Sequence, residues 1–169
     1  MIKQLQGHIT EYEINLILGI IKNQYQMFLR LIGSQEFTSI FADEYAPHKR
    51  QHSVSWAISS AFPSGTTIGD SLEVERLVYG KGHTRPILKN ETIELHILTK
   101  TTLFNADYLK QRYKYNSDNF KQEKLFAYVK FAVENKRLVS VLLCLPDATG
   151  KVVEKETLIS RDVLQLIAA

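Results

Sequence analysis

The stretch from Lys124 to Leu145 constrains the fold of this chain more than any other feature. Over 125–133 the odd-numbered positions are all apolar, whereas the even-numbered ones include Lys130. That alternation predicts a half-buried β-strand. The nearly unbroken apolar run over 138–145 suits a strand covered on both faces or a short buried helix, and its β-branched residues, with Pro146 behind it, favour the strand. We therefore expect a hairpin, extended to a meander by a third strand over 151–156.

Three earlier segments also carry strand patterns. Residues 72–79 alternate imperfectly, and residues 92–100 place Ile93, Leu95 and Ile97 on one face. Residues 54–60 alternate large and small side chains, which favours a strand with a helix as close second. The glycine-rich stretch from Gly80 to Pro86 predicts a basic loop.

The segment from Ile9 to Gly33 is the clearest helix in the sequence. Thr10 and Glu13 have the spacing of a capping box, and Gly33 predicts a left-handed end. Apolar residues recur at steps of three and four, so the helix over 10–32 is expected to pack on the sheet.

These patterns predict an α+β fold: a mostly antiparallel sheet of about five to six strands, with the long N-terminal amphipathic helix on one face. A chain of 169 residues, 44% of them apolar, fits a single domain over 1–169. No stretch is apolar enough to cross a bilayer and no secretory signal is evident, so the cytoplasm is the expected location and no membrane contact is expected. Cys144 is the single cysteine and is expected to be a buried small hydrophobe.

Basic residues concentrate in one region of the chain. Residues 105–137 contain eight lysines and arginines against four acidic residues, although the net charge of the whole chain is only +3. Within a helix predicted to open at Asn105 or Asp107 and run through Tyr113, basic and aromatic side chains alternate, which suits phosphate contacts and base stacking. An ordinary amphipathic helix explains the same pattern. The candidate binding residues here are Lys110, Arg112, Lys114 and Tyr115.

The loop from Gly80 to Arg85 is a second candidate for binding an anion. Glycines let backbone N–H groups approach an anion, and Lys81, His83 and Arg85 supply side-chain donors. The loop matches no phosphate-binding motif, so a solvated hairpin loop is the simpler interpretation.

A third group of residues has the types needed for metal chemistry. Asp70 is followed by Glu94 and His96, and then by Gln111 and Tyr115. This order resembles that of restriction-type and RecB-like nucleases, which use an acidic residue, a Glu-x-Lys pair on the next strand and, in one branch, a Gln-x-x-x-Tyr helix. The resemblance implies that Asp70 and Glu94 hold Mg²⁺ and that Gln111 and Tyr115 contact DNA. His96 stands where those nucleases have lysine, and surface charges on strands are the alternative explanation.

Two main hypotheses follow. The first is a non-catalytic binding or accessory protein without a cofactor, engaging nucleic acid or an acidic protein through its basic surface. The alternative is a Mg²⁺-dependent nuclease that uses Asp70, Glu94 and His96. A third hypothesis, an inhibitor or subunit of a larger complex, predicts an exposed apolar patch. The sequence assigns no oligomeric state.

Overall fold

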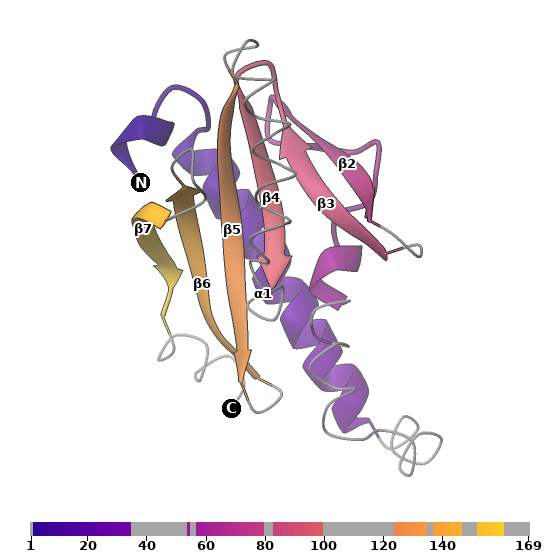
Figure 1. Ribbon diagram of the computed structural model, residues 1–169. Helices are drawn as coiled ribbons and strands as arrows, with labels where there is room; N and C mark the ends of the chain where they lie inside the picture. The colour runs from indigo at the N-terminus through magenta and orange to yellow at the C-terminus, as the bar shows by residue number, and fades with distance from the viewer. Residues whose placement is uncertain are drawn as a thin grey trace.

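The part of the chain that the structure describes combines one long helix with one seven-stranded sheet, so the α+β class is confirmed (Figure 1). The computed structural model describes residues 2–34, 54, 57–79, 83–99, 124–134, 137–146 and 152–160. The predicted count of five to six strands was too low. Two strands, Thr67–Ile68 and His83–Lys89, were missed, and one of the six predicted segments, 54–60, contains helix instead of strand.

The strands lie in the sheet in the order in which they occur in the chain. They are β1 (Thr67–Ile68), β2 (Leu72–Tyr79), β3 (His83–Lys89), β4 (Ile93–Thr99), β5 (Leu125–Glu134), β6 (Arg137–Pro146) and β7 (Val152–Ile159). All neighbours pair antiparallel except β4 and β5, which are parallel. Two antiparallel meanders, β1–β4 and β5–β7, are therefore joined through one parallel pair.

The N-terminal residues form a short 3₁₀ helix, η1 (Lys3–Leu5), followed by the long helix α1 (Glu11–Gly33). The capping box is confirmed: the Glu13 backbone N–H donates to Thr10 Oγ1 at 3.1 Å, and the Thr10 N–H donates to Glu13 Oε2 at 2.9 Å. The prediction of a left-handed Gly33 was wrong. Ser34 ends the helix in an extended conformation, and its N–H and hydroxyl both donate to the Leu31 carbonyl.

The main core lies between α1 and one face of the sheet, here called the inner face. Because side chains alternate along a strand, Ala127, Val129 and Phe131 point to this face and join the buried side of α1. That buried side consists of Glu13, Ile14, Ile17, Leu18, Ile21, Tyr25 and Phe28. The cluster takes residues from both meanders, so the helix packs across the junction between them.

The opposite face, here called the outer face, carries a second and smaller buried cluster. Its members are Leu98, Phe126, Tyr128 and Cys144, each at most 7% exposed. The prediction that Cys144 is buried is confirmed, and burial raises the pKa of its thiol. A thiol in this state is a poor nucleophile.

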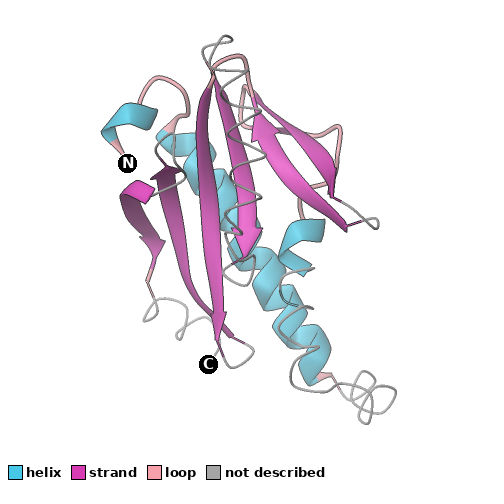
Figure 2. Cartoon of the chain, viewed as in Figure 1, coloured by secondary structure: helices cyan, strands magenta, loops and turns pink. Residues whose placement is uncertain are grey.

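The predicted strand over 54–60 was wrong: residues 57–60 are helical (Figure 2). Ala57 and Ile58 are buried in the main core, and Phe62 is buried just after the turn. The guanidinium of Arg76 on β2 donates to the carbonyls of Ser59 and Phe62, both at 3.1 Å. Arg76 thereby satisfies carbonyls at the end of a helical turn, which have no partner within the helix itself.

The predicted loop over 80–86 is also corrected in part, since His83, Arg85 and Pro86 belong to β3. Pro86 pairs with Arg76 of β2, but the described pairing of β3 with β4 covers only Ile87–Lys89. Proline is tolerated at this position because it lies beyond that pairing, where no ladder N–H is needed.

Several expectations concern segments that lie outside the described residues. These are the helix predicted to open at Asn105 or Asp107 and run through Tyr113, and residues 80–82 of the predicted loop. Within the described part of the chain, no helix has the length and apolar character needed to span a membrane. The single domain over 1–169 and the cytoplasmic location remain predictions.

A hydrogen-bonded network ties the start of α1 to the turn between β1 and β2. The buried carboxylate of Glu13 accepts from the Ser71 hydroxyl at 2.8 Å, and Gly69 lies against the same side chain with φ +62°. A Cβ at position 69 would lie 2.5 Å from Glu13 Cγ. The turn therefore requires glycine both for its conformation and for the close approach.

Two glycines give a matched test of this packing. Gly19 lies inside α1 with open space where a Cβ would be, so Gly19→Ala should raise the free energy of unfolding by roughly 0.5–1 kcal/mol. Gly69→Ala should lower it by about 1–3 kcal/mol, because alanine is strained at a left-handed position and also meets Glu13. Urea denaturation of both variants checks this. Equal effects of the two substitutions would contradict the assigned turn.

Glu13 should make stability depend on pH. Burial alone would raise the pKa of Glu13, but hydrogen bonds from Thr10 and Ser71 outweigh it and hold the pKa below its ordinary value of 4.5. The ionised carboxylate therefore stabilises the fold above about pH 4.5, and this contribution is lost as the pH falls through the lower folded-state pKa. Denaturation of wild type and Glu13→Gln across pH 3–7 should show a stability difference that shrinks on acidification. A difference that does not change with pH would contradict the role of the charge.

Candidate binding site

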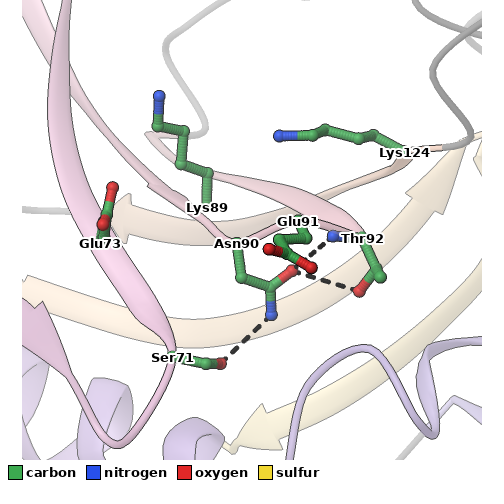
Figure 3. Close-up of a pocket in the computed structure, with 7 residues that line it drawn as sticks. All are labelled: Ser71, Glu73, Lys89, Asn90, Glu91, Thr92 and Lys124. Atoms are coloured by element: carbon green, nitrogen blue, oxygen red, sulfur yellow. Dashed lines mark hydrogen bonds between the residues drawn. The ribbon is translucent and has the colours of Figure 1, made fainter.

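A polar pocket of about 550 Å³ opens where β2 and β5 begin and where β3 turns into β4 (Figure 3). Its lining residues are Ser71, Glu73, Lys89, Asn90, Glu91, Thr92 and Lys124. Four of these seven side chains are charged, two of each sign. The pocket therefore joins segments from both meanders at one end of the sheet.

Asn90 organises the floor of the pocket. Its side-chain oxygen accepts from the backbone N–H groups of Thr92 and Ile93, both at 2.9 Å, and so closes the turn between β3 and β4. Its amide nitrogen donates to the His8 carbonyl at 3.0 Å and to the Ser71 hydroxyl at 3.2 Å. Since Ser71 in turn donates to Glu13, the floor is connected to the first turn of α1 and is held rigidly.

The rim of the pocket is charged. Lys89 Nζ lies 2.5 Å from Glu75 Oε1, and the two side chains are 32% and 54% exposed. Lys124 extends from the start of β5 across the pocket toward the strand that carries Lys89 (Figure 3). Lys124 makes no ion pair with any carboxylate in the described segments, so it is the cation of the rim most able to accept an anionic group from a ligand.

The charges on β2, β3 and β4 alternate across the strands. Glu73 pairs with Lys89, and Lys89 pairs with Glu94 on its other side, so the three side chains share the outer face. The hydrogen bond that Lys89 donates to Glu75 is the main cause that raises the pKa of Lys89. Burial lowers this pKa, whereas the charges of Glu75, Glu73 and Glu94 raise it further. Lys89 is therefore fully protonated at neutral pH.

The residues of the nuclease hypothesis are only partly brought together. Glu94 and His96 lie on one face of β4, with Glu94 Oε1 and His96 Nε2 2.5 Å apart, and their side chains are 14% and 0% exposed. The His96 ring also packs edge-on against Phe126, with ring centroids 4.8 Å apart. Asp70 is exposed in the turn between β1 and β2. Among the described residues no three histidine, cysteine, aspartate or glutamate side chains form a group able to hold a metal ion, so Asp70 does not complete such a group with this pair.

The residues of the basic-surface hypothesis fall mostly outside the described residues. This applies to Lys81, Lys110, Arg112, Lys114 and Tyr115, and also to Gln111 of the nuclease pattern. The backbone of His83 pairs with Tyr79, and Arg85 is half-buried on β3, opposite Leu77 of β2. Whether these cations share one surface remains a prediction.

Sequence reasoning missed the residues that build the pocket. One local signal was available. Asn90 lies two residues before Thr92 at the start of a strand, and an asparagine in such a position often closes a turn by accepting backbone N–H groups with its side-chain oxygen. The remaining members come together through pairings between distant strands. Lys89, for example, meets Glu75 because β2 and β3 pair antiparallel.

Comparisons with protein-family models, with curated proteins and with solved structures found no match to this chain.

Asn90 offers a direct test of the pocket floor. Asn90→Ala should lower the free energy of unfolding by about 2–3 kcal/mol, because it removes both the closure of the turn and the bonds to His8 and Ser71. Glu91→Ala, at the exposed neighbouring position, is the control and should change stability by less than about 0.5 kcal/mol. Thermal and urea unfolding measure both. Equal stabilities of the two variants would show that the floor is not held through Asn90.

Proposed function

We propose that this protein is a non-catalytic binding or accessory protein that holds an acidic segment of a protein partner at the pocket rim. The observation that carries the proposal is the position of Lys124. Its ammonium group reaches over a pocket whose floor is fixed by Asn90, and no described carboxylate is paired with it. A carboxylate of the partner would complete this pairing.

The mixed charge of the rim favours a polypeptide over nucleic acid as the partner. Glu73 and Glu91 line the same pocket as the two lysines, and Glu75 already neutralises Lys89. A nucleic-acid strand carries a phosphate on every nucleotide, so several phosphates would meet these carboxylates at short range. A polypeptide can place one carboxylate on Lys124 and keep its other groups clear of the glutamates.

The buried state of the Glu94–His96 pair supports a non-catalytic role. A catalytic histidine must reach its substrate, whereas the side chain of His96 is 0% exposed and is bonded to Glu94. The pair is better explained as a satisfied polar contact beside the second buried cluster.

Charge reversal at the rim tests the proposal. Fluorescence anisotropy would measure binding of a labelled peptide that carries a single glutamate among neutral residues, and of a single-stranded oligonucleotide of similar length, over a range of salt concentrations. Lys124→Glu should weaken peptide binding by about tenfold, equivalent to roughly 1.4 kcal/mol. Lys155→Glu, an exposed position on β7 at the far edge of the sheet, is the matched control and should leave binding unchanged.

Three results would overturn the proposal. Equal effects of Lys124→Glu and Lys155→Glu would remove the pocket as the binding site. Tighter binding of the oligonucleotide than of the peptide, with a steep dependence on salt, would indicate a nucleic-acid partner instead. Cleavage of DNA in Mg²⁺ or Mn²⁺ that disappears in Glu94→Gln would establish the nuclease alternative.

A further inference from the structure

The rim of the candidate binding pocket carries opposite charges on its two sides. Glu73 belongs to β2, whereas Lys124 directly precedes β5, and β3 and β4 lie between them in the sheet. With about 4.8 Å between neighbouring strands, the backbones of the two residues are about 14 Å apart, measured across the strands. Their side chains stand on opposite sides of the pocket, and that of Lys124 is directed toward Lys89 (Figure 3). The pocket is therefore polarised across the sheet.

On the β2 side of the pocket, carboxylates outnumber cations. The ammonium group of Lys89 lies in the field of three carboxylates, those of Glu75, Glu73 and Glu94. Glu75 is bonded to Lys89 itself, and Glu94 is bonded to His96. Glu73 is exposed and forms no ion pair within the described segments. It is therefore the carboxylate of this side that lacks a compensating cation.

On the β5 side, the charge without a counterion is positive. Lys124 forms no ion pair with a described carboxylate, although Glu91 lines the same pocket. The carboxylate of Glu91 lies beside Asn90 and Thr92 at the turn, whereas the Lys124 side chain extends over the pocket (Figure 3). The two uncompensated groups of the rim thus have opposite signs and face each other across the opening.

We infer that the partner segment carries a basic side chain in addition to the acidic one, and that this basic side chain pairs with Glu73 while the acidic one pairs with Lys124. The inference rests on the proposed function, which assigns the acidic side chain to Lys124. It narrows the partner from an acidic segment to a segment of mixed charge. Such a segment is complementary to both sides of the rim, whereas a purely acidic one would meet repulsion from Glu73.

The separation of the two rim charges fits an extended segment. The Lys124 side chain reaches toward β3, which brings its ammonium group nearer to Glu73 than the backbone spacing alone would (Figure 3). In an extended polypeptide, side chains on one face are about 7 Å apart at a spacing of two residues and about 14 Å apart at four. The acidic and basic residues of the partner are therefore two or four positions apart. Because the two rim charges are separated across the strands, the segment lies over the end of the sheet and does not add a strand to its edge.

The overall charge of the chain makes this arrangement distinguishable from long-range attraction. The chain has a formal net charge of +3, so long-range attraction favours the peptide with the most negative charge. Adding a lysine to an acidic peptide removes that advantage. Tighter binding of the peptide with both charges would therefore report a local contact with a carboxylate of the pocket.

Three labelled peptides of equal length, with blocked ends and otherwise neutral residues, test the inference by fluorescence anisotropy at low ionic strength. The first carries a single glutamate, the second adds a lysine four residues away, and the third has a second glutamate in place of that lysine. Wild type should bind the second peptide most tightly, about two- to fivefold more tightly than the first. Glu73→Gln should bind the first and second equally. Glu73→Lys should reverse the order and bind the third most tightly.

Glu154→Lys is the matched control, because it makes the same change on β7 at the far edge of the sheet and should keep the order of wild type. Circular dichroism checks that every variant is folded. Equal affinities of wild type for the first and second peptides would overturn the inference, as would the same reversal in Glu154→Lys. Either result leaves the proposed function standing if Lys124→Glu still weakens binding of the peptides. If Lys124→Glu changes none of the affinities, the proposed function fails and the inference fails with it.

Discussion

The packing of α1 across the inner face of the sheet is the interaction on which the rest of this structure depends. Among the described strands, the two antiparallel meanders pair with each other only where β4 lies parallel to β5. The apolar side of α1 contributes to one core cluster with Leu88 and Leu95 of the first meander and Val129 and Leu143 of the second. The helix thus joins the two halves through burial of apolar surface, the dominant favourable term in folding.

The alternation of side chains was enough to predict much of this fold. It located β2 and β4–β7 within a few residues, and the Thr10–Glu13 spacing located the start of α1. It failed at β3, because glycines and a proline such as Pro86 usually end a strand. Whether a strand can contain a proline depends on where its neighbours pair with it, and here the pairing with β4 covers only the residues after Pro86. It failed again at 57–60, where a helical turn is held by Arg76 from β2. Both failures have tertiary causes.

The pocket was less accessible to sequence reasoning than the fold. Its floor depends on hydrogen bonds between residues far apart in the chain, with 58 residues separating Ser71 from Glu13 and 82 separating Asn90 from His8. The sequence pattern correctly placed Glu94 and His96 on one face of a strand. It did not reveal that the outer face is largely buried at these two positions. The burial depends on the second cluster, which is built from residues of β4, β5 and β6.

Native-state hydrogen exchange measures most directly whether α1 makes the two meanders one cooperative unit. Amides in β2–β4, in β5–β7 and on the buried side of α1 should exchange with the same free energy of opening, equal to that of global unfolding. All three groups should also shift together with added denaturant. If one meander exchanges at a distinctly lower free energy while α1 and the other stay protected, the central role assigned to this helix is contradicted.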